Sequence, residues 1–203
     1  MEPPVPIEDI PTRLAAQCAP ASHFARIGAL QALAAREPSL RAMALVGSYA
    51  KGTGDRVSDL DLVAIVDAGC VDRVLSHAQT VLRTDDVLNE FGGRRVSGGA
   101  FRKLVYLDFS SVEFHVVELG AGFRLRRPFL AVWDPHDLLP SLVADGEPIR
   151  HEDFAAYEYG DEGLLWELVD CIKWLSRGRH ELAKRHIAKL AAQMASSGKP
   201  GGI

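Results

Sequence analysis

Two aspartates, Asp59 and Asp61, alternate with leucines at the start of an apolar segment that is typical of a β-strand. Because side chains alternate between the two faces of a strand, we expect both carboxylates on one face. Two unit charges about 4 Å apart repel by about 4 kcal/mol at an effective dielectric constant of about 20, so the pair requires neutralisation. Mg²⁺ is usually held by one or two carboxylates together with phosphates and water. The pair therefore points to phosphate chemistry that depends on a divalent cation.

A glycine-serine turn, Gly47-Ser48, follows the apolar residues 44–46 and precedes a segment expected to be a short helix. Free backbone N–H groups at such a turn attract anions. Glycine lets a phosphate approach the backbone closely, and the Ser48 hydroxyl can donate a further hydrogen bond. The turn and the aspartates together predict a site for the polyphosphate tail of a nucleotide.

Gly47-Ser48, then Gly52, then Ser58-Asp59-Leu60-Asp61 occur in one order between two apolar strands. This arrangement resembles the motif of the DNA polymerase beta-like nucleotidyltransferase superfamily. The resemblance implies transfer of a nucleoside monophosphate from a nucleoside triphosphate to an acceptor hydroxyl, with release of pyrophosphate. It also implies a two-metal mechanism, with Mg²⁺ or Mn²⁺ held by the two aspartates. The alternative is an ordinary turn followed by a solvated strand start.

The resemblance also implies a third acidic residue on a strand beside the paired aspartates. Residues 112–117 are similar to that strand in family members, which places the acid at Glu113, as a metal ligand and as the group that takes the acceptor proton. Glu113 is one methylene longer than the more usual aspartate. His115 faces the same side of the strand, and we interpret it as a strand residue with a satisfied hydrogen bond, the alternatives being an orienting group or a base.

The remaining pattern predicts an α/β (α+β) fold, with a small mixed β-sheet, flanking helices and a C-terminal helical segment. The resemblance implies that this sheet is a nucleotidyltransferase core. Helices are expected over residues 7–36, with a break at Pro20 and Ser22, and over residues 71–82. Strands are expected at residues 42–46, 60–66, 103–107, 112–119 and 129–133, and the glycine-rich residues 91–100 predict a mobile loop or an irregular hairpin.

Two further helices are expected after residue 153, separated by Arg177-Gly178. They resemble the helical substrate-side segment of antibiotic nucleotidyltransferase-like proteins. The expected domains are a catalytic domain with N-terminal helices at 1–145, a substrate-side helical segment at 150–195 and a disordered tail at 196–203. The resemblance implies a small-molecule acceptor such as an aminoglycoside or lincosamide, with a protein side chain as the alternative.

Other residues have two readings each. Lys173 is taken as a nucleotide-binding residue that reaches the triphosphate, against a solvated helix lysine. Arg94 and Arg95 could contact phosphate, although solvated loop charges are favoured. Trp166 and Trp174 could stack on a base, although their helical spacing favours core positions.

Composition excludes several classes of protein. The 203 residues carry a net charge of −4, so a general grip on an extended nucleic acid is not expected. No apolar run approaches the roughly 20 residues that span a bilayer, and the N-terminus lacks a signal-peptide pattern, so a cytoplasmic location is expected. The rival function is a catalytically idle nucleotide-binding or antitoxin-like partner protein on the same fold, which the departure at Glu113 favours.

Overall fold

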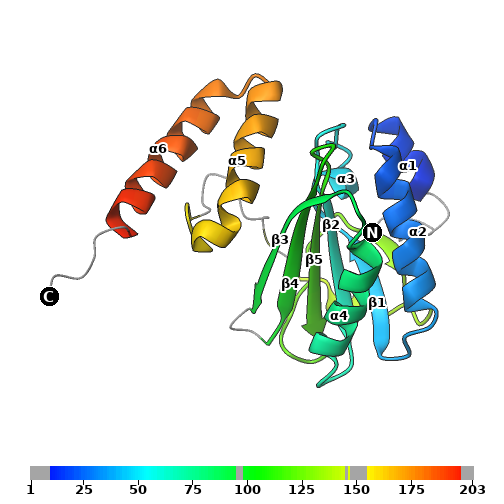
Figure 1. Cartoon of the computed structure of the whole chain (residues 1–203). Coiled ribbons are helices and arrows are strands. Elements are labelled where there is room, and N and C mark those ends of the chain that lie inside the picture. Colours follow the sequence, from blue (N-terminus) through cyan, green and yellow to red (C-terminus); the bar gives the residue numbers. More distant parts are fainter. Residues whose placement is uncertain (1–9, 95–97, 145, 147–154, 198–203) are drawn as a thin grey trace, which may run out of the picture. The chain divides into compact units, whose positions relative to one another are not determined.

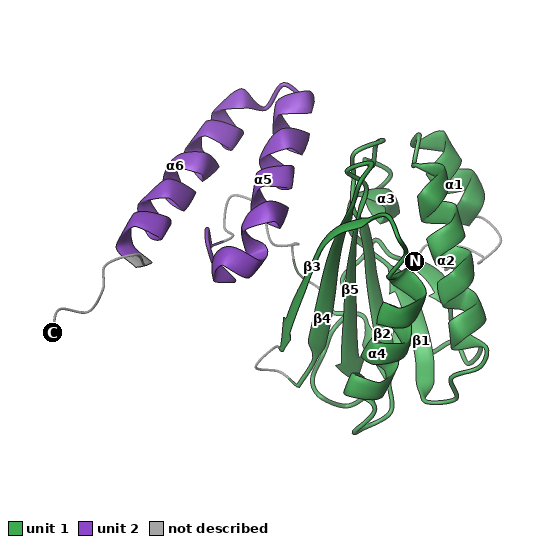
Figure 2. Cartoon of the chain, viewed as in Figure 1, with its two compact units in different colours: residues 1–147 green, residues 148–203 purple. Residues whose placement is uncertain are grey.

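The computed structural model of the chain describes residues 10–94, 98–144, 146 and 155–197. The chain divides into two compact units, residues 1–147 and residues 148–203 (Figure 2). The first unit holds the sheet and its covering helices, and the second holds a pair of helices. Within the described ranges, no helix combines the length and the apolar character needed to cross a bilayer.

One mixed sheet forms the centre of the first unit, with the strand order β3-β4-β5-β2-β1-β6 (Figure 1). β2 and β5 run parallel, whereas all other neighbouring strands run antiparallel. The strands are β1 Leu40–Leu45, β2 Leu60–Val66, β3 Val87–Arg94, β4 Ala100–Tyr106, β5 Ser111–Glu118 and β6 Leu130–Trp133. The sheet with its flanking helices confirms the expected mixed α and β fold class.

Helices cover one face of this sheet (Figure 1). The helices of the unit are α1 Ile10–Ala16, α2 Ala21–Ala34, the short α3 Gly47–Lys51, α4 Val71–Leu82 and the 3-10 turn Leu139–Leu142. α4 contacts β4 and β5, while α2 contacts α4 and β6. The apolar stripe of α4, which includes Val74, Leu75 and Ala78, joins the main hydrophobic core, as its three- and four-residue spacing predicts.

The period of two along β2 divides its side chains between the two faces of the sheet. Leu60 and Leu62 are fully buried in the main core beneath the helices. Val63 and Ile65 belong to a second apolar cluster on the opposite face, where they meet Phe129 and Leu139. Asp61 shares the parity of Val63, so the carboxylate is placed on the face opposite α2 and α4.

The second unit is built from α5 Gly160–Ser176 and α6 His180–Ser197. Arg177 and Gly178 separate the two helices as expected, and Gly178 adopts a left-handed conformation with φ of 70°. Trp174, Cys171 and Ala183 form a small buried cluster between the helices. His186 Nε2 donates a hydrogen bond to Glu167 Oε2 at 2.8 Å, which ties α6 to α5.

Residues 87–94 differ most from the sequence-based expectation. Val87–Arg94 forms β3 and pairs with β4, so the hairpin alternative for residues 91–100 is the one observed, with residues 95–97 outside the described part of the chain. A Cβ at Gly92 would lie 2.4 Å from the carbonyl oxygen of Phe101. The glycine that obscures the strand pattern therefore permits the close approach of the two strands.

The other ends of elements fall near their predicted positions. Pro20 separates α1 from α2, and Asp134 closes the turn after β6 by accepting hydrogen bonds from the backbone N–H groups of Leu138 and Leu139 at 2.7 and 2.9 Å. α6 continues through Ser197, two residues into the segment expected to be a disordered tail. Residues 198–203 of that segment lie outside the described residues.

Candidate active site

Gly47 and Asp61 are packed against each other where β1 ends. The backbone N–H of Val46 donates a hydrogen bond to the Asp61 carbonyl at 2.9 Å, and the chain then turns into α3. Gly47 has φ of +69°, and a Cβ at this position would lie 1.8 Å from Asp61 Oδ2. Only glycine provides both the backbone conformation and the space. The position of the Asp61 carboxylate therefore depends on the conformation of the Gly47 turn.

Asp59 and Asp61 flank the first residue of β2, and both residues are half-buried. Ser111, the first residue of β5, donates a hydrogen bond from its hydroxyl to Asp59 Oδ1. Asp61 is the register partner of Glu113 across the parallel β2–β5 pair. The parallel pairing therefore brings the carboxyl groups of two neighbouring strands to one end of the sheet.

Glu113 has a partner on each carboxylate oxygen. His115 Nε2 donates a hydrogen bond to Oε1 at 2.6 Å, and Lys103 Nζ lies 3.1 Å from Oε2. Burial opposes ionisation of this carboxyl group, but the His115 hydrogen bond and the Lys103 charge outweigh it and lower the pKa of Glu113 to about 2. Glu113 is therefore a carboxylate at neutral pH. His115 lies on the same side as Glu113, as expected, and its satisfied hydrogen bond is to Glu113 itself.

Ser48 and Gly52 define the rest of the turn. Ser48 is half-buried in α3, and its carbonyl accepts the backbone N–H of Thr53 at 3.0 Å. Gly52 ends α3 in a left-handed conformation with φ of 74°. The Tyr49 hydroxyl donates a hydrogen bond to the Asp55 carbonyl at 2.6 Å and so closes the loop that leads to Asp59.

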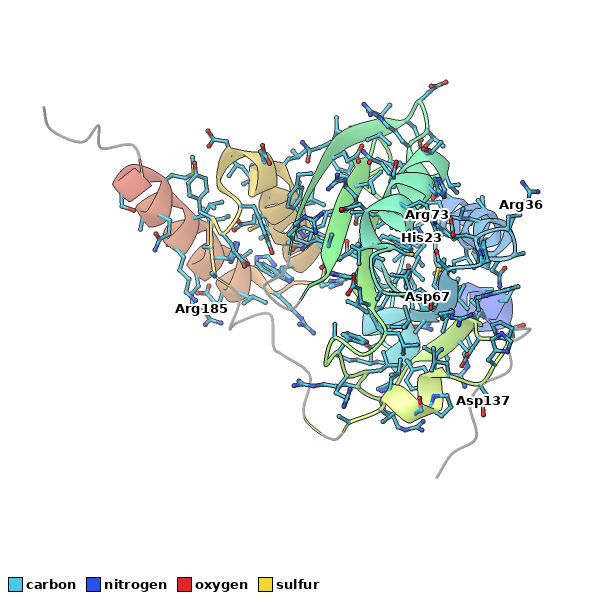
Figure 3. The ribbon with its side chains drawn as sticks, turned by 90° about the horizontal axis from the view of Figure 1, so that it is seen from below. His23, Arg36, Asp67, Arg73, Asp137 and Arg185 are labelled. Carbon is cyan, nitrogen blue, oxygen red and sulfur yellow. The ribbon has the colours of Figure 1, made fainter. Side chains whose placement is uncertain are left out.

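A buried histidine holds the far end of the same loop. His23 of α2 is fully buried, and its Nε2 lies 3.1 Å from the Ser58 carbonyl, so this nitrogen carries the proton and donates. Its ring meets that of Tyr49 edge to face at 5.7 Å between centroids. Burial lowers the pKa of His23, so the imidazole is neutral at pH 7. His23 is labelled among the side chains of the first unit in Figure 3.

Lys103 and Ser111 contact predicted site residues, and His23 contacts Ser58 beside them, but the sequence motif identifies none of the three. Two of these contacts join residues far apart along the chain: His23 and Ser58 are 35 residues apart, and Ser111 and Asp59 are 52 apart. The alternation of side chains along β4 and β5 does not by itself pair Lys103 with Glu113. That pairing follows only from the register between the two strands.

Arg94 and Lys173 each have an acidic partner in the structure. Arg94 pairs with Asp72 of α4, and both side chains are exposed. Arg95 lies outside the described residues. Lys173 belongs to the second unit, where its buried ammonium lies 3.2 Å from Asp170 Oδ1 and 5.1 Å from the centroid of the Trp166 ring. Trp166 and Trp174 are both buried, which agrees with core positions.

The donor set suits a hard cation in part. Asp59 and Asp61 offer carboxylate oxygens on one face of the sheet, which is the number of carboxylates that usually holds Mg²⁺ beside phosphates. Glu113 adds a third carboxylate nearby, but Lys103 and His115 occupy it. Accordingly, no group of three or more His, Cys, Asp or Glu side chains is arranged as a metal cluster among the residues that the structure describes.

Comparison with known proteins agrees with this geometry over part of the chain. Residues 28–97 match the model of a nucleotidyltransferase domain, a stretch that contains Gly47, Ser48, Asp59 and Asp61 but ends before Glu113. No curated protein matches the chain. Among solved structures, the chain is similar to one in the structure of the GLD-2/RNP-8 complex, with 18% sequence identity and a TM-score of 0.36. The match covers 54% of this chain and 42% of that one, so the chain spans less than half the length of that protein.

Proposed function

We propose that the chain is a nucleotidyltransferase that moves a nucleoside monophosphate from a nucleoside triphosphate to an acceptor hydroxyl. The acceptor oxygen forms a bond to the α-phosphorus, the bond from that phosphorus to the bridging oxygen breaks, and pyrophosphate leaves. The observation that carries the proposal is the packing of the Gly47 backbone against the Asp61 carboxylate, beside Asp59, which is held by Ser111. The nucleotidyltransferase domain match over residues 28–97 supports it.

In this proposal Asp59, Asp61 and Glu113 hold two divalent cations, Mg²⁺ or Mn²⁺. When bound, such cations lower the pKa of the acceptor hydroxyl and offset the charge of the leaving pyrophosphate. Ser111 fixes the Asp59 carboxylate, and the Gly47 turn fixes the Asp61 carboxylate. Both ligands are therefore oriented before a substrate arrives, which reduces the entropy that binding has to remove.

The other predicted residues have roles toward the nucleotide and the acceptor. Gly47 and Ser48 contact the leaving phosphates, and Lys173 is proposed as a nucleotide-binding residue. Glu113 accepts the proton of the acceptor hydroxyl, which a bound divalent cation would make more acidic. The acceptor is a small molecule of the aminoglycoside or lincosamide type, with a protein side chain as the second possibility.

The Asp59→Asn variant tests the proposal. The amide keeps the shape of the side chain but removes the charge, so we expect pyrophosphate release from ATP in the presence of Mg²⁺ and an accepted substrate to fall by at least about a hundredfold. Asp72→Asn is the matched control, because Asp72 lies exposed on α4, which packs on the other face of the sheet. Turnover by the Asp59 variant equal to that of the control would refute the metal-dependent proposal.

One observation favours a second function, that of an idle nucleotide-binding or antitoxin-like protein. Both oxygens of Glu113 already have cationic or donor partners, as in a structural ion pair. Thermal shift separates the enzyme from an antitoxin-like protein that binds no nucleotide, because a ligand that binds the native state raises its stability with the logarithm of ligand concentration. Stabilisation by ATP that requires Mg²⁺ supports the enzyme, and the lack of any shift with a triphosphate supports the interaction protein.

A further inference from the structure

Lys103, Glu113 and Asp61 form one row across three adjacent strands. Lys103 on β4 is the register partner of Glu113 on β5, and Glu113 is in turn the partner of Asp61 on β2. Side chains at register positions in neighbouring strands project on the same face and lie within reach of one another. A positive side chain thus stands on the far side of Glu113 from the paired aspartates.

The Lys103–Glu113 pair differs from an ordinary surface ion pair. The Lys103 side chain is 14% exposed and that of Glu113 is 21% exposed, so water screens the contact poorly. The ring of His115, which holds the other oxygen, packs on Phe101 at 5.7 Å between centroids. Glu113 is therefore held at both oxygens by groups that are themselves fixed.

The Lys103 ammonium beside Oε2 would repel a divalent cation bound at the same oxygen. Lys103 Nζ lies 3.1 Å from Glu113 Oε2, so the ammonium already compensates the charge of this oxygen. Removal of the ammonium would leave a half-buried carboxylate with one charge uncompensated, and an uncompensated buried charge is costly. Either cation, the Lys103 ammonium or a metal ion, would compensate the charge of the Glu113 carboxylate.

We propose that Lys103 is a positioning residue that competes with a divalent cation for Glu113. The inference rests on the proposed function, because it assigns the cation to that site. Lys103 holds the carboxylate while the cation is absent, and a cation that binds at Glu113 displaces the ammonium.

Binding of Mn²⁺ alone to the full-length chain tests this competition, with free Mn²⁺ measured by electron paramagnetic resonance. We expect Lys103→Gln to tighten Mn²⁺ binding by roughly fivefold or more, because it removes the competing cation. We expect Lys103→Arg to remain close to the wild type, because it keeps the charge. Lys51→Gln on α3 is the matched control for the loss of a positive charge near the site without contact with Glu113.

The double variant decides whether the competition is direct. In a Glu113→Gln background there is no carboxylate to compete for, so Lys103→Gln should change the Mn²⁺ affinity no more than Lys51→Gln does. The same tightening in both backgrounds would show an effect of charge through space and would overturn the proposal, as would no tightening at all. Thermal melts establish that each variant is folded, and Lys103→Met replaces Lys103→Gln if the latter is not.

Failure of this inference differs from failure of the proposed function. If the chain releases pyrophosphate from ATP but its Mn²⁺ affinity does not change on Lys103→Gln, the proposed function stands and the competition is refuted. A chain that shows the predicted changes in Mn²⁺ affinity, but turns over no triphosphate with any acceptor, retains the competition and refutes the transferase.

Discussion

At the scale of single residues, the site depends on close contacts that allow little substitution. Gly47 has to be glycine because the Asp61 carboxylate occupies the place where a Cβ would stand. Asp59 depends on the hydroxyl of Ser111, and Glu113 depends on Lys103 and His115. Each proposed functional side chain is therefore set by a neighbour on another element, which is how rigid sites keep their geometry.

Gly47→Ala should damage both stability and activity. The added methyl group meets the Asp61 carboxylate in a left-handed backbone conformation, and we expect a loss of about 2–4 kcal/mol in the free energy of unfolding. Gly69→Ala is the matched control, because Gly69 has a similar φ of +74° with nothing within 4 Å of its would-be Cβ. It should lose only about 1–2 kcal/mol and keep its pyrophosphate release.

Urea denaturation monitored by circular dichroism measures both variants, and the same preparations are assayed for pyrophosphate. Equal losses of stability and activity in the two variants would show that backbone strain, and not contact with Asp61, is what Gly47 prevents.

A second residue-scale prediction concerns Glu37, which joins three elements away from the site. Its carboxylate accepts hydrogen bonds from the Ser39 hydroxyl at 2.6 Å and from His77 Nδ1 at 2.9 Å, and Arg73 Nη2 lies 3.2 Å away. The Ser39 hydrogen bond is the main cause that lowers the pKa of Glu37 below its ordinary value of 4.5. The folded state therefore binds this proton less readily than the unfolded state.

The sign of the pH effect follows directly. The stabilisation is fully present above pH 4.5, the ordinary value, and is lost as the pH falls below it toward the lowered pKa of the folded state. Glu37→Gln should cost about 1–3 kcal/mol at pH 7 and progressively less below pH 4.5. Urea titrations from pH 7 to pH 3 measure this difference, and a loss that is independent of pH would contradict the assignment.

At the scale of elements, the strands and helices with a clear period are predictable from the sequence. α4 falls at Val71–Leu82, as the spacing of Val74, Leu75 and Ala78 predicts, and β2 and β5 carry the paired apolar and polar residues that their alternation predicts. The motif at residues 47–61 determines the turn and the two aspartates, because all of its parts are local in sequence.

The strand register limits what the sequence reveals about the site. The pairing of Lys103 with Glu113 follows from the alignment of β4 with β5, and a shift of one residue would send Lys103 to the opposite face. Likewise, the contact from His23 to Ser58 depends on how α2 lies on the sheet. β3 is missed for a local reason, since its two adjacent glycines, Gly92 and Gly93, lower the strand propensity that would have marked it.

At the scale of the whole molecule, the proposed chemistry is divided unequally between the two units. The turn, both aspartates and Glu113 belong to the first unit, and the nucleotidyltransferase domain match falls entirely within it. The second unit has its own buried cluster and its own ion pairs. In the pair between Lys173 and Asp170, the Lys173 side chain is almost fully buried. Lys173 is the predicted nucleotide-binding residue that lies in the second unit, and this prediction can be tested separately.

Lys173→Met keeps the length and apolar stem of the side chain but removes the ammonium. If Lys173 contacts the triphosphate as proposed, the ATP concentration that gives half of the maximal thermal shift in the presence of Mg²⁺ should rise by about tenfold, the size of one charge-assisted hydrogen bond. Lys184→Met is the matched control, because Lys184 is exposed on α6 and pairs with Glu181 within one turn of helix. A lower melting temperature of the Lys173 variant with unchanged dependence on ATP would show that Lys173 only stabilises the second unit, through Asp170 and the Trp166 ring.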